Sequence, residues 1–90
     1  SHMPLRPKDD PHNLWNGQEI INIIEKSEHV VAFINGHNHS GGHVLKNGIH
    51  YITVFGMVDT PISSYGILEF YKDSLSLRGY GNQKDISIKL

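Results

Sequence analysis

Apolar and polar residues recur along the chain with two different periods, and these periods predict its elements. Over 16–28 the isoleucines follow the three- and four-residue spacing of a helix, with Asn16 as the N-cap and Glu19 completing a capping-box-like pair. The run Val-Val-Ala-Phe-Ile over 30–34 is short and apolar on both faces, which is typical of a strand buried on both sides. We therefore predict a loop over 1–15, a helix over 16–28 and a central strand over 30–34.

Two hairpins are predicted over residues 43–80. The dipeptide Asn47-Gly48 separates two β-rich runs, and it is a strong hairpin signal because both residues tolerate positive φ. A second turn at Lys72-Asp73 separates two further runs, and the tail over 81–90 is either an edge strand or mobile. One helix with a mainly antiparallel sheet of about five strands makes the chain α+β. The predicted core residues are Ile20, Ile24, Val31, Phe33, Ile52, Val54, Leu68, Phe70, Leu75 and Leu77.

Composition narrows the functional classes. Lys plus Arg number 8 and Asp plus Glu number 9, so the net charge of −1 gives no electrostatic signature for nucleic acid or an anionic membrane. The chain has no cysteine, which excludes disulfides and thiolate metal sites. No apolar run approaches the roughly 18 residues of a membrane span, and a cytoplasmic location is favoured. Seven histidines in 90 residues are the one unusual feature.

The segment Gly-His-Asn-His-Ser-Gly-Gly, residues 36–42, follows the apolar strand directly. Side chains at i and i+2 share a face in an extended segment, whereas a turning loop lets His37 and His39 diverge toward two neighbouring ions. Neutral imidazole suits Zn, Mn, Fe or Ni. The alternative interpretation is an exposed loop whose histidines bind nothing. A strand that is apolar throughout and ends in this motif favours a metal loop.

In this setting the sequence resembles a family. Val-Val-Ala-Phe-Ile-Asn-Gly-His-Asn-His-Ser-Gly-Gly is similar to the last motif of the calcineurin-like metallophosphoesterases, and Ser-His-Met-Pro over 1–4 resembles their penultimate motif. Leu-Trp-Asn over 14–16 and the helix follow in the expected order, so the resemblance covers nearly the whole chain. The most similar branch is that of the manganese-dependent ADP-ribose/CDP-alcohol diphosphatases. The resemblance implies that the chain is the C-terminal portion of a four-layer αββα sandwich.

The resemblance also implies roles for individual residues. His37 would ligate one ion of a dinuclear site, His39 would ligate the other, and His2 would join His37. A cleaved affinity tag also leaves Ser-His-Met, in which case His2 only imitates the motif; the Pro4 and Leu5 that follow favour native sequence. The residues with an implied supporting or substrate-side role are Asn38, Ser40, Gly41, Gly42 and His43.

The family's earlier motifs, Asp-x-His, Gly-Asp-x-x-Asp and Gly-Asn-His-Asp/Glu, are not recognised here. We therefore expect the C-terminal segment of an enzyme that uses two divalent ions (Mn, Fe or Zn) to hydrolyse phosphate esters or nucleoside-diphosphate-linked small molecules. This chain, with no catalytic residue of its own, would be inactive alone and hold at most one ion.

We also expect the isolated chain to form a homodimer or to exchange elements with a second copy. The alternative function is a non-catalytic β-rich module that binds one Zn or Ni through His37 and His39, or that serves in assembly.

Overall fold

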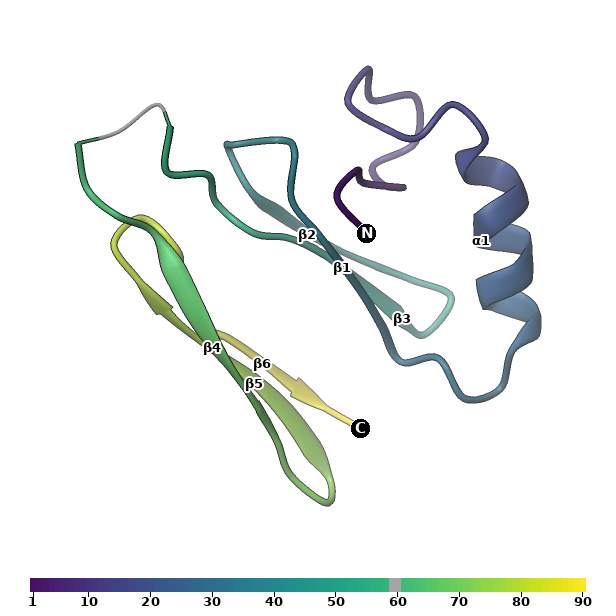
Figure 1. The fold of residues 1–90 in the computed structure, drawn as a ribbon. Helices are drawn as coiled ribbons and strands as arrows, with labels where there is room; N and C mark the ends of the chain where they lie inside the picture. Colours follow the sequence, from purple (N-terminus) through teal and green to yellow (C-terminus); the bar gives the residue numbers. More distant parts are fainter. Residues whose placement is uncertain (59–60) are drawn as a thin grey trace.

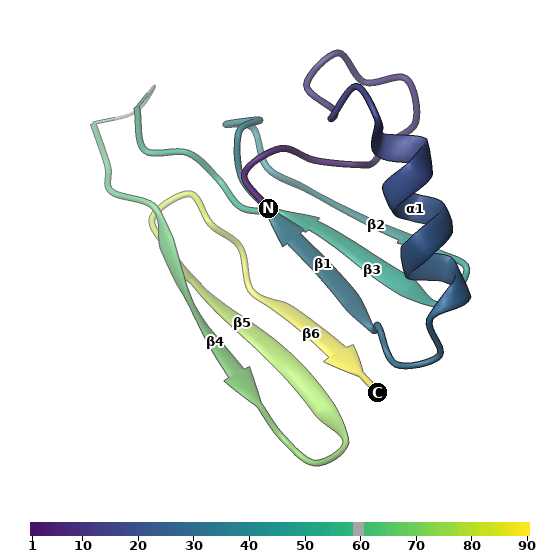
Figure 2. The ribbon, with the colours of Figure 1, turned by 45° about the vertical axis from the view of Figure 1, so that its right-hand side comes forward.

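The computed structural model describes residues 1–58 and 61–90, and these residues form three layers. Figures 1 and 2 show the helix on one side of a first sheet and a second sheet on the other side. The order along the chain is α1 (Gly17–Lys26), β1 (Ala32–Asn35), β2 (Gly42–Lys46), β3 (Ile49–Thr53), β4 (Tyr65–Phe70), β5 (Ser74–Tyr80) and β6 (Ile86–Lys89). The predicted α+β class is confirmed.

The first sheet has the strand order β1-β3-β2, so β3 lies in the middle. It pairs in parallel with β1 and antiparallel with β2. The predicted turn connects β2 to β3, and both of its residues adopt positive φ, 51° for Asn47 and 75° for Gly48. The strand that we predicted as central over 30–34 does not lie in the middle of this sheet. The strand spans 32–35 and lies at an edge of the sheet, because β3 takes the position between the other two strands.

The second sheet is fully antiparallel, with the order β4-β5-β6. Its β4–β5 pair is the second predicted hairpin, closed by a hydrogen bond from the Tyr71 N–H to the Ser74 carbonyl. The tail over 81–90 forms the edge strand β6 and buries Ile88, which is 3% exposed. The described residues therefore form six strands in two sheets, where the sequence predicted about five strands in one.

Helix α1 is shorter than predicted and begins differently. It spans 17–26, where 16–28 was expected, and Ser27 is its C-cap. Asn16 occupies the N-cap position, but its side chain makes no capping hydrogen bond, so the predicted capping box is not formed. The Asn16 backbone carbonyl instead accepts a hydrogen bond from the Glu19 N–H.

The core consists of two clusters on opposite faces of the first sheet, because successive residues of a strand point to opposite sides. One cluster joins the helix to the sheet and contains Leu5, Ile21, Ile24, Ile49 and Tyr51. The other joins the two sheets and contains Ile52, Leu75, Leu77 and Ile88.

Eight of the ten predicted core residues are buried or packed against these clusters, while two predictions are wrong. Phe70 is 73% exposed at the far end of edge strand β4, and Val31 is 41% exposed in the connection before β1. The helix faces the sheet through Ile21 and Ile24. Each residue turns the helix by about 100°, so Ile23 points away from the side that Ile24 presents to the sheet and is 70% exposed.

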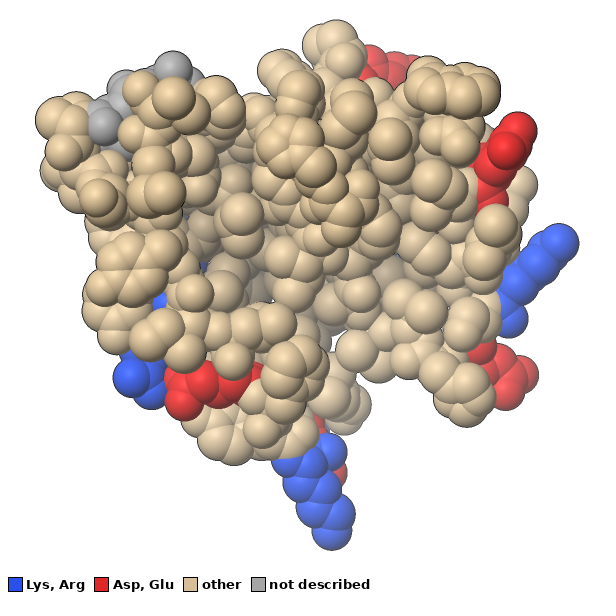
Figure 3. Space-filling model, viewed as in Figure 1, with Lys and Arg blue, Asp and Glu red and all other residues tan. Residues whose placement is uncertain are grey.

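The surface carries charge unevenly. Figure 3 shows one face that is almost free of Lys, Arg, Asp and Glu, with charged side chains mostly around its margin. Thirteen large hydrophobic side chains are exposed among the described residues, Trp15 at 93% being the most exposed. No helix in the described part of the chain is long and apolar enough to cross a membrane.

Candidate metal centre

The first sheet brings two distant segments to the same end. Strands β1 and β3 are parallel, so the segments that follow them, 36–41 and 54–56, leave the sheet side by side. The Val54 N–H donates to the carbonyl of Asn35, and the Gly56 N–H donates to the carbonyl of His39. The histidine loop is therefore attached along one side to the chain that follows β3.

A buried amide anchors the start of this loop. Asn35 is 3% exposed, and its Nδ2 donates to the carbonyl of Gly36 (2.9 Å) and to Oγ1 of Thr53 (3.0 Å). Sequence reasoning assigned no role to Asn35. Its only signal is a polar residue at the end of an apolar run, which is also how many strands end.

His37, two residues after Asn35, has left-handed backbone geometry, with φ at 65°. Non-glycine residues adopt this conformation rarely, and such strain is concentrated at functional sites. Two tight turns follow it. The Gly41 N–H donates to the carbonyl of Asn38, and the Ser40 N–H donates to Asn38 Oδ1. Asn38 thus shapes the loop around the histidines.

The structure brings His2 and His37 together. Nε2 of His2 lies 3.1 Å from Nδ1 of His37, with their rings edge to face. The Gly36 N–H donates to the carbonyl of His2, and the terminal ammonium of Ser1 donates to the carbonyl of Ile34, so residues 1–2 run beside the end of β1. Two ring nitrogens 3.1 Å apart, each about 2.05 Å from one ion, enclose an angle of about 100° at that ion. This separation fits two imidazoles on a single metal.

Sequence reasoning missed a third histidine beside this pair. The ring of His12 lies 5.8 Å from the ring of His37 between centroids, and Asp10 Oδ1 lies 2.8 Å from His12 Nδ1. Hydrogen bonds from the backbone N–H and then the ring of His12 lower the pKa of Asp10, so this carboxylate stays ionised. Asp10-Pro11-His12 has the letter spacing of the family's Asp-x-His motif, but it lies in a turn and ends no strand.

The ring of His39 lies close to the backbone of Gly56. A Cβ atom added to Gly56 would lie 2.8 Å from the His39 ring, and one added to Gly41 would lie 2.6 Å from the ring of Phe55. The segment 55–56 therefore packs closely against the loop, and only glycine fits at these two positions. In the described part of the chain, no three His, Asp or Glu side chains are placed to hold a metal ion together. The histidines His2, His37 and His39 thus fit only part of the ligand set that a metal ion needs.

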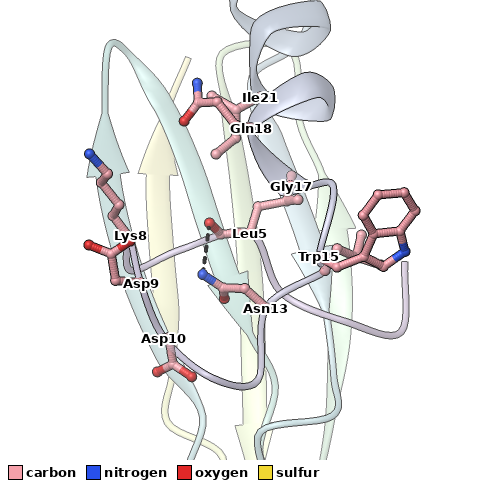
Figure 4. A pocket seen from close by; sticks show the side chains of 10 residues that line it. Leu5, Lys8, Asp9, Asp10, Asn13, Trp15, Gly17, Gln18 and Ile21 are labelled. Atoms are coloured by element: carbon pink, nitrogen blue, oxygen red, sulfur yellow. Dashed lines mark hydrogen bonds between the residues drawn. The ribbon is translucent and has the colours of Figure 1, made fainter.

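One pocket lies beside the histidine loop, and another is lined by residues outside it. One, of about 320 Å³, is lined by Ser40, Gly41, Gly42 and His43 together with Phe55 and Lys84. The other, of about 510 Å³, lies between the N-terminal loop and α1. Figure 4 shows its lining: Leu5 at the centre with its carbonyl hydrogen-bonded to Asn13, and Trp15 extending away from the other side chains.

Comparison with known proteins gives this geometry a context. The chain is 36% identical over 90 residues to the manganese-dependent ADP-ribose/CDP-alcohol diphosphatase of Xenopus tropicalis, a match that covers 94% of this chain and 26% of that protein. It is 32% identical to proteins of the same name from Danio rerio, over 98% of this chain and 29% of the relative, and from Arabidopsis thaliana, over 87% and 27%. No family model matches the chain.

A solved structure gives the same result. The crystal structure of a dimetal phosphatase from Danio rerio matches 99% of this chain with a TM-score of 0.93 at 29% identity. The chain belongs to the calcineurin-like metallophosphoesterases. The match covers 30% of the Danio rerio chain, so this metallophosphoesterase segment spans between a quarter and a third of the proteins it resembles. The predicted family, with its dimetal phosphatase fold, is confirmed.

Proposed function

We propose that this chain supplies the histidine side of a dinuclear phosphoesterase centre that hydrolyses nucleoside-diphosphate-linked small molecules. The observation that carries the proposal is the 3.1 Å contact between His2 and His37, side chains 35 residues apart in the sequence. Diphosphatase names among the relatives and manganese dependence in those names support the substrate class and the metal.

In this proposal His2 and His37 hold one divalent ion and His39 holds the second. Bound divalent ions neutralise phosphoryl oxygens and lower the pKa of coordinated water. Asn38 fixes the turn between the two ligands through its bond to the Ser40 N–H. Gly41 and Gly42 keep the adjacent pocket open because they carry no side chain.

The chain alone would bind metal incompletely. Without carboxylate ligands an imidazole pair prefers Zn²⁺ or Ni²⁺ to Mn²⁺. Because protons compete with the metal for the ligating nitrogens, affinity falls as the pH is lowered. We expect no phosphodiester turnover, because a second ion and a leaving-group acid are both needed.

Calorimetric titration of the purified chain with Zn²⁺ and Ni²⁺ tests the ligands. His37→Ala should weaken binding of one ion at least tenfold, whereas His29→Ala, at an exposed position away from the loop, should leave it unchanged. Equal binding by wild type and His37→Ala would overturn the ligand assignment.

A second assay tests activity separately. The chain is incubated with Mn²⁺ or Zn²⁺ and bis-(p-nitrophenyl) phosphate beside the His37→Ala/His39→Ala double variant. Metal-dependent hydrolysis that the double variant loses would refute the expected inactivity while supporting the metal ligands.

A further inference from the structure

A second histidine pair lies on the β2–β3 hairpin, outside the loop described above. Nε2 of His43 is 2.9 Å from Nδ1 of His50, and the two rings stack with centroids 5.2 Å apart. His43 pairs across the strands with Ile52, and His50 pairs with Leu45, so the histidines are diagonal neighbours on one face of the sheet. The resemblance to a family implied a supporting or substrate-side role for His43, whereas His50 was not among the candidate site residues.

The backbone under this pair is rigid. His50 is in the middle strand of the first sheet, between Ile49 and Tyr51, which are 5% and 2% exposed. The tight Asn47-Gly48 turn sets the register of the hairpin. The two rings are therefore held close together before any ligand arrives, which reduces the entropy cost of binding.

Both nitrogens that face each other have the chemistry of metal ligands. Neutral imidazole binds first-row transition metals through its unprotonated nitrogen. One of the two facing nitrogens carries the hydrogen of their hydrogen bond, and that ring frees the nitrogen by changing tautomer, which moves the proton to its other ring nitrogen. Burial lowers the pKa of His50, and the positive charge of protonated His43 lowers it further, so the neutral form prevails at pH 7.

We propose that His43 and His50 together bind one Cu²⁺ or Ni²⁺ ion at a site separate from the Gly-His-x-His loop. Metal–nitrogen bonds of about 2.05 Å to nitrogens 2.9 Å apart enclose an angle of about 90°. Adjacent ligands of square-planar or octahedral ions have this angle, and Cu²⁺ and Ni²⁺ adopt such geometries.

The site has two protein ligands. No cluster of three ligating side chains exists among residues 1–58 and 61–90, so water completes the coordination. Affinity therefore follows the intrinsic order of the ions, with Cu²⁺ above Ni²⁺ and Mn²⁺ far below. The ion cross-links β2 to β3 and stabilises the folded chain by mass action.

The test uses Cu²⁺ titration of the whole chain followed by electron paramagnetic resonance. The reference protein is the His2→Ala/His37→Ala/His39→Ala variant, which removes the loop ligands and the Cu²⁺ binding that a terminal Ser-His sequence offers. We expect the reference to bind one Cu²⁺ with a spectrum of two nitrogen ligands. Adding His50→Gln or His43→Gln should weaken that binding at least tenfold and remove the two-nitrogen spectrum, whereas adding His29→Gln should change neither.

Two results would overturn the proposal. One is Cu²⁺ binding by the reference protein that neither His43→Gln nor His50→Gln weakens. The other is Zn²⁺ binding to the reference as tight as Cu²⁺ binding, because a site of two imidazoles and water should follow the intrinsic order of the ions. We expect the His43 variant to stay folded, because His43 is exposed and its loss leaves no cavity. Far-ultraviolet circular dichroism of each variant checks that it is folded.

Discussion

The buried amide of Asn35 should be the most sensitive polar position in the chain. It joins the end of β1 to the end of β3 and holds the residue before His37. In Asn35→Ala the hydroxyl of Thr53, which is 7% exposed, loses its buried partner, and the carbonyl of Gly36 loses a donor. The perturbation therefore combines a loss of stability with a loosening of the metal loop.

The magnitude follows from the burial of the two groups. An unsatisfied buried polar group costs about 1–3 kcal/mol. The Thr53 hydroxyl should contribute most of this cost, because water can reach the half-buried Gly36. We expect Asn35→Ala to lower the free energy of unfolding by about 2 kcal/mol, which for a chain of this length lowers Tm by about 10 °C.

Urea unfolding followed by far-ultraviolet circular dichroism measures the effect. Asn38→Ala is the matched control. It removes the same kind of side chain three residues later, in the loop, where its one acceptor bond lies at the surface, and the expected loss is below about 1 kcal/mol. A double-mutant cycle with Thr53→Val should give a coupling energy of about 1 kcal/mol. Additive effects of the two substitutions, or an unchanged midpoint for Asn35→Ala, would refute the reasoning.

Four further predictions concern the core, the loop, pH and association. Ile52→Ala, at a fully buried position between the sheets, should cost about 2–5 kcal/mol by thermal unfolding, against less than about 0.5 kcal/mol for the exposed Ile23→Ala. Gly41→Ala should cost about 1–3 kcal/mol in the same measurement, because φ is +67° and the new methyl group would meet the Phe55 ring; an unchanged Tm would show that the loop yields. The lowered pKa of His50 means that the unfolded chain takes up the proton first, so stability should fall as pH drops below about 6.5, and His50→Gln should reduce that fall between pH 7.5 and 5.5 in urea midpoints. The uncharged face and the unpaired sheet edges should make the isolated chain dimerise, so that sedimentation at tens of micromolar protein gives the mass of two chains; a monomer there would contradict this.

The sequence predicted well the parts of the fold that a few adjacent residues determine. The Asn47-Gly48 turn was found because two adjacent residues determine it by themselves. The position of β1 in its sheet was not found, because it depends on which strands compete for each edge and no residue within 30–34 encodes that choice. The exposure of Trp15 has a similar cause, because aromatic character alone favours packing, but the N-terminal loop places the ring outside the core.

The candidate site was also predicted only in part. The motif over 36–42 identified His37 and His39, and the resemblance to a family proposed His2 for the same ion as His37. The geometry places that pair together, and the assignment of all three as ligands stays a prediction. The approach of His12 to His37 and the contact between His43 and His50 were not predicted. Both depend on how separate segments are oriented, which neither periodicity nor spacing reports.

The position of Trp15 has an optical consequence. It is the one tryptophan of the chain, it is 93% exposed, and it lines the pocket of about 510 Å³ between the N-terminal loop and α1. An indole that is already in water changes its emission little when the protein unfolds, but it shifts to the blue when a ligand or another protein surface covers it. Intrinsic fluorescence of this chain therefore reports contact at the surface around Trp15, independently of unfolding.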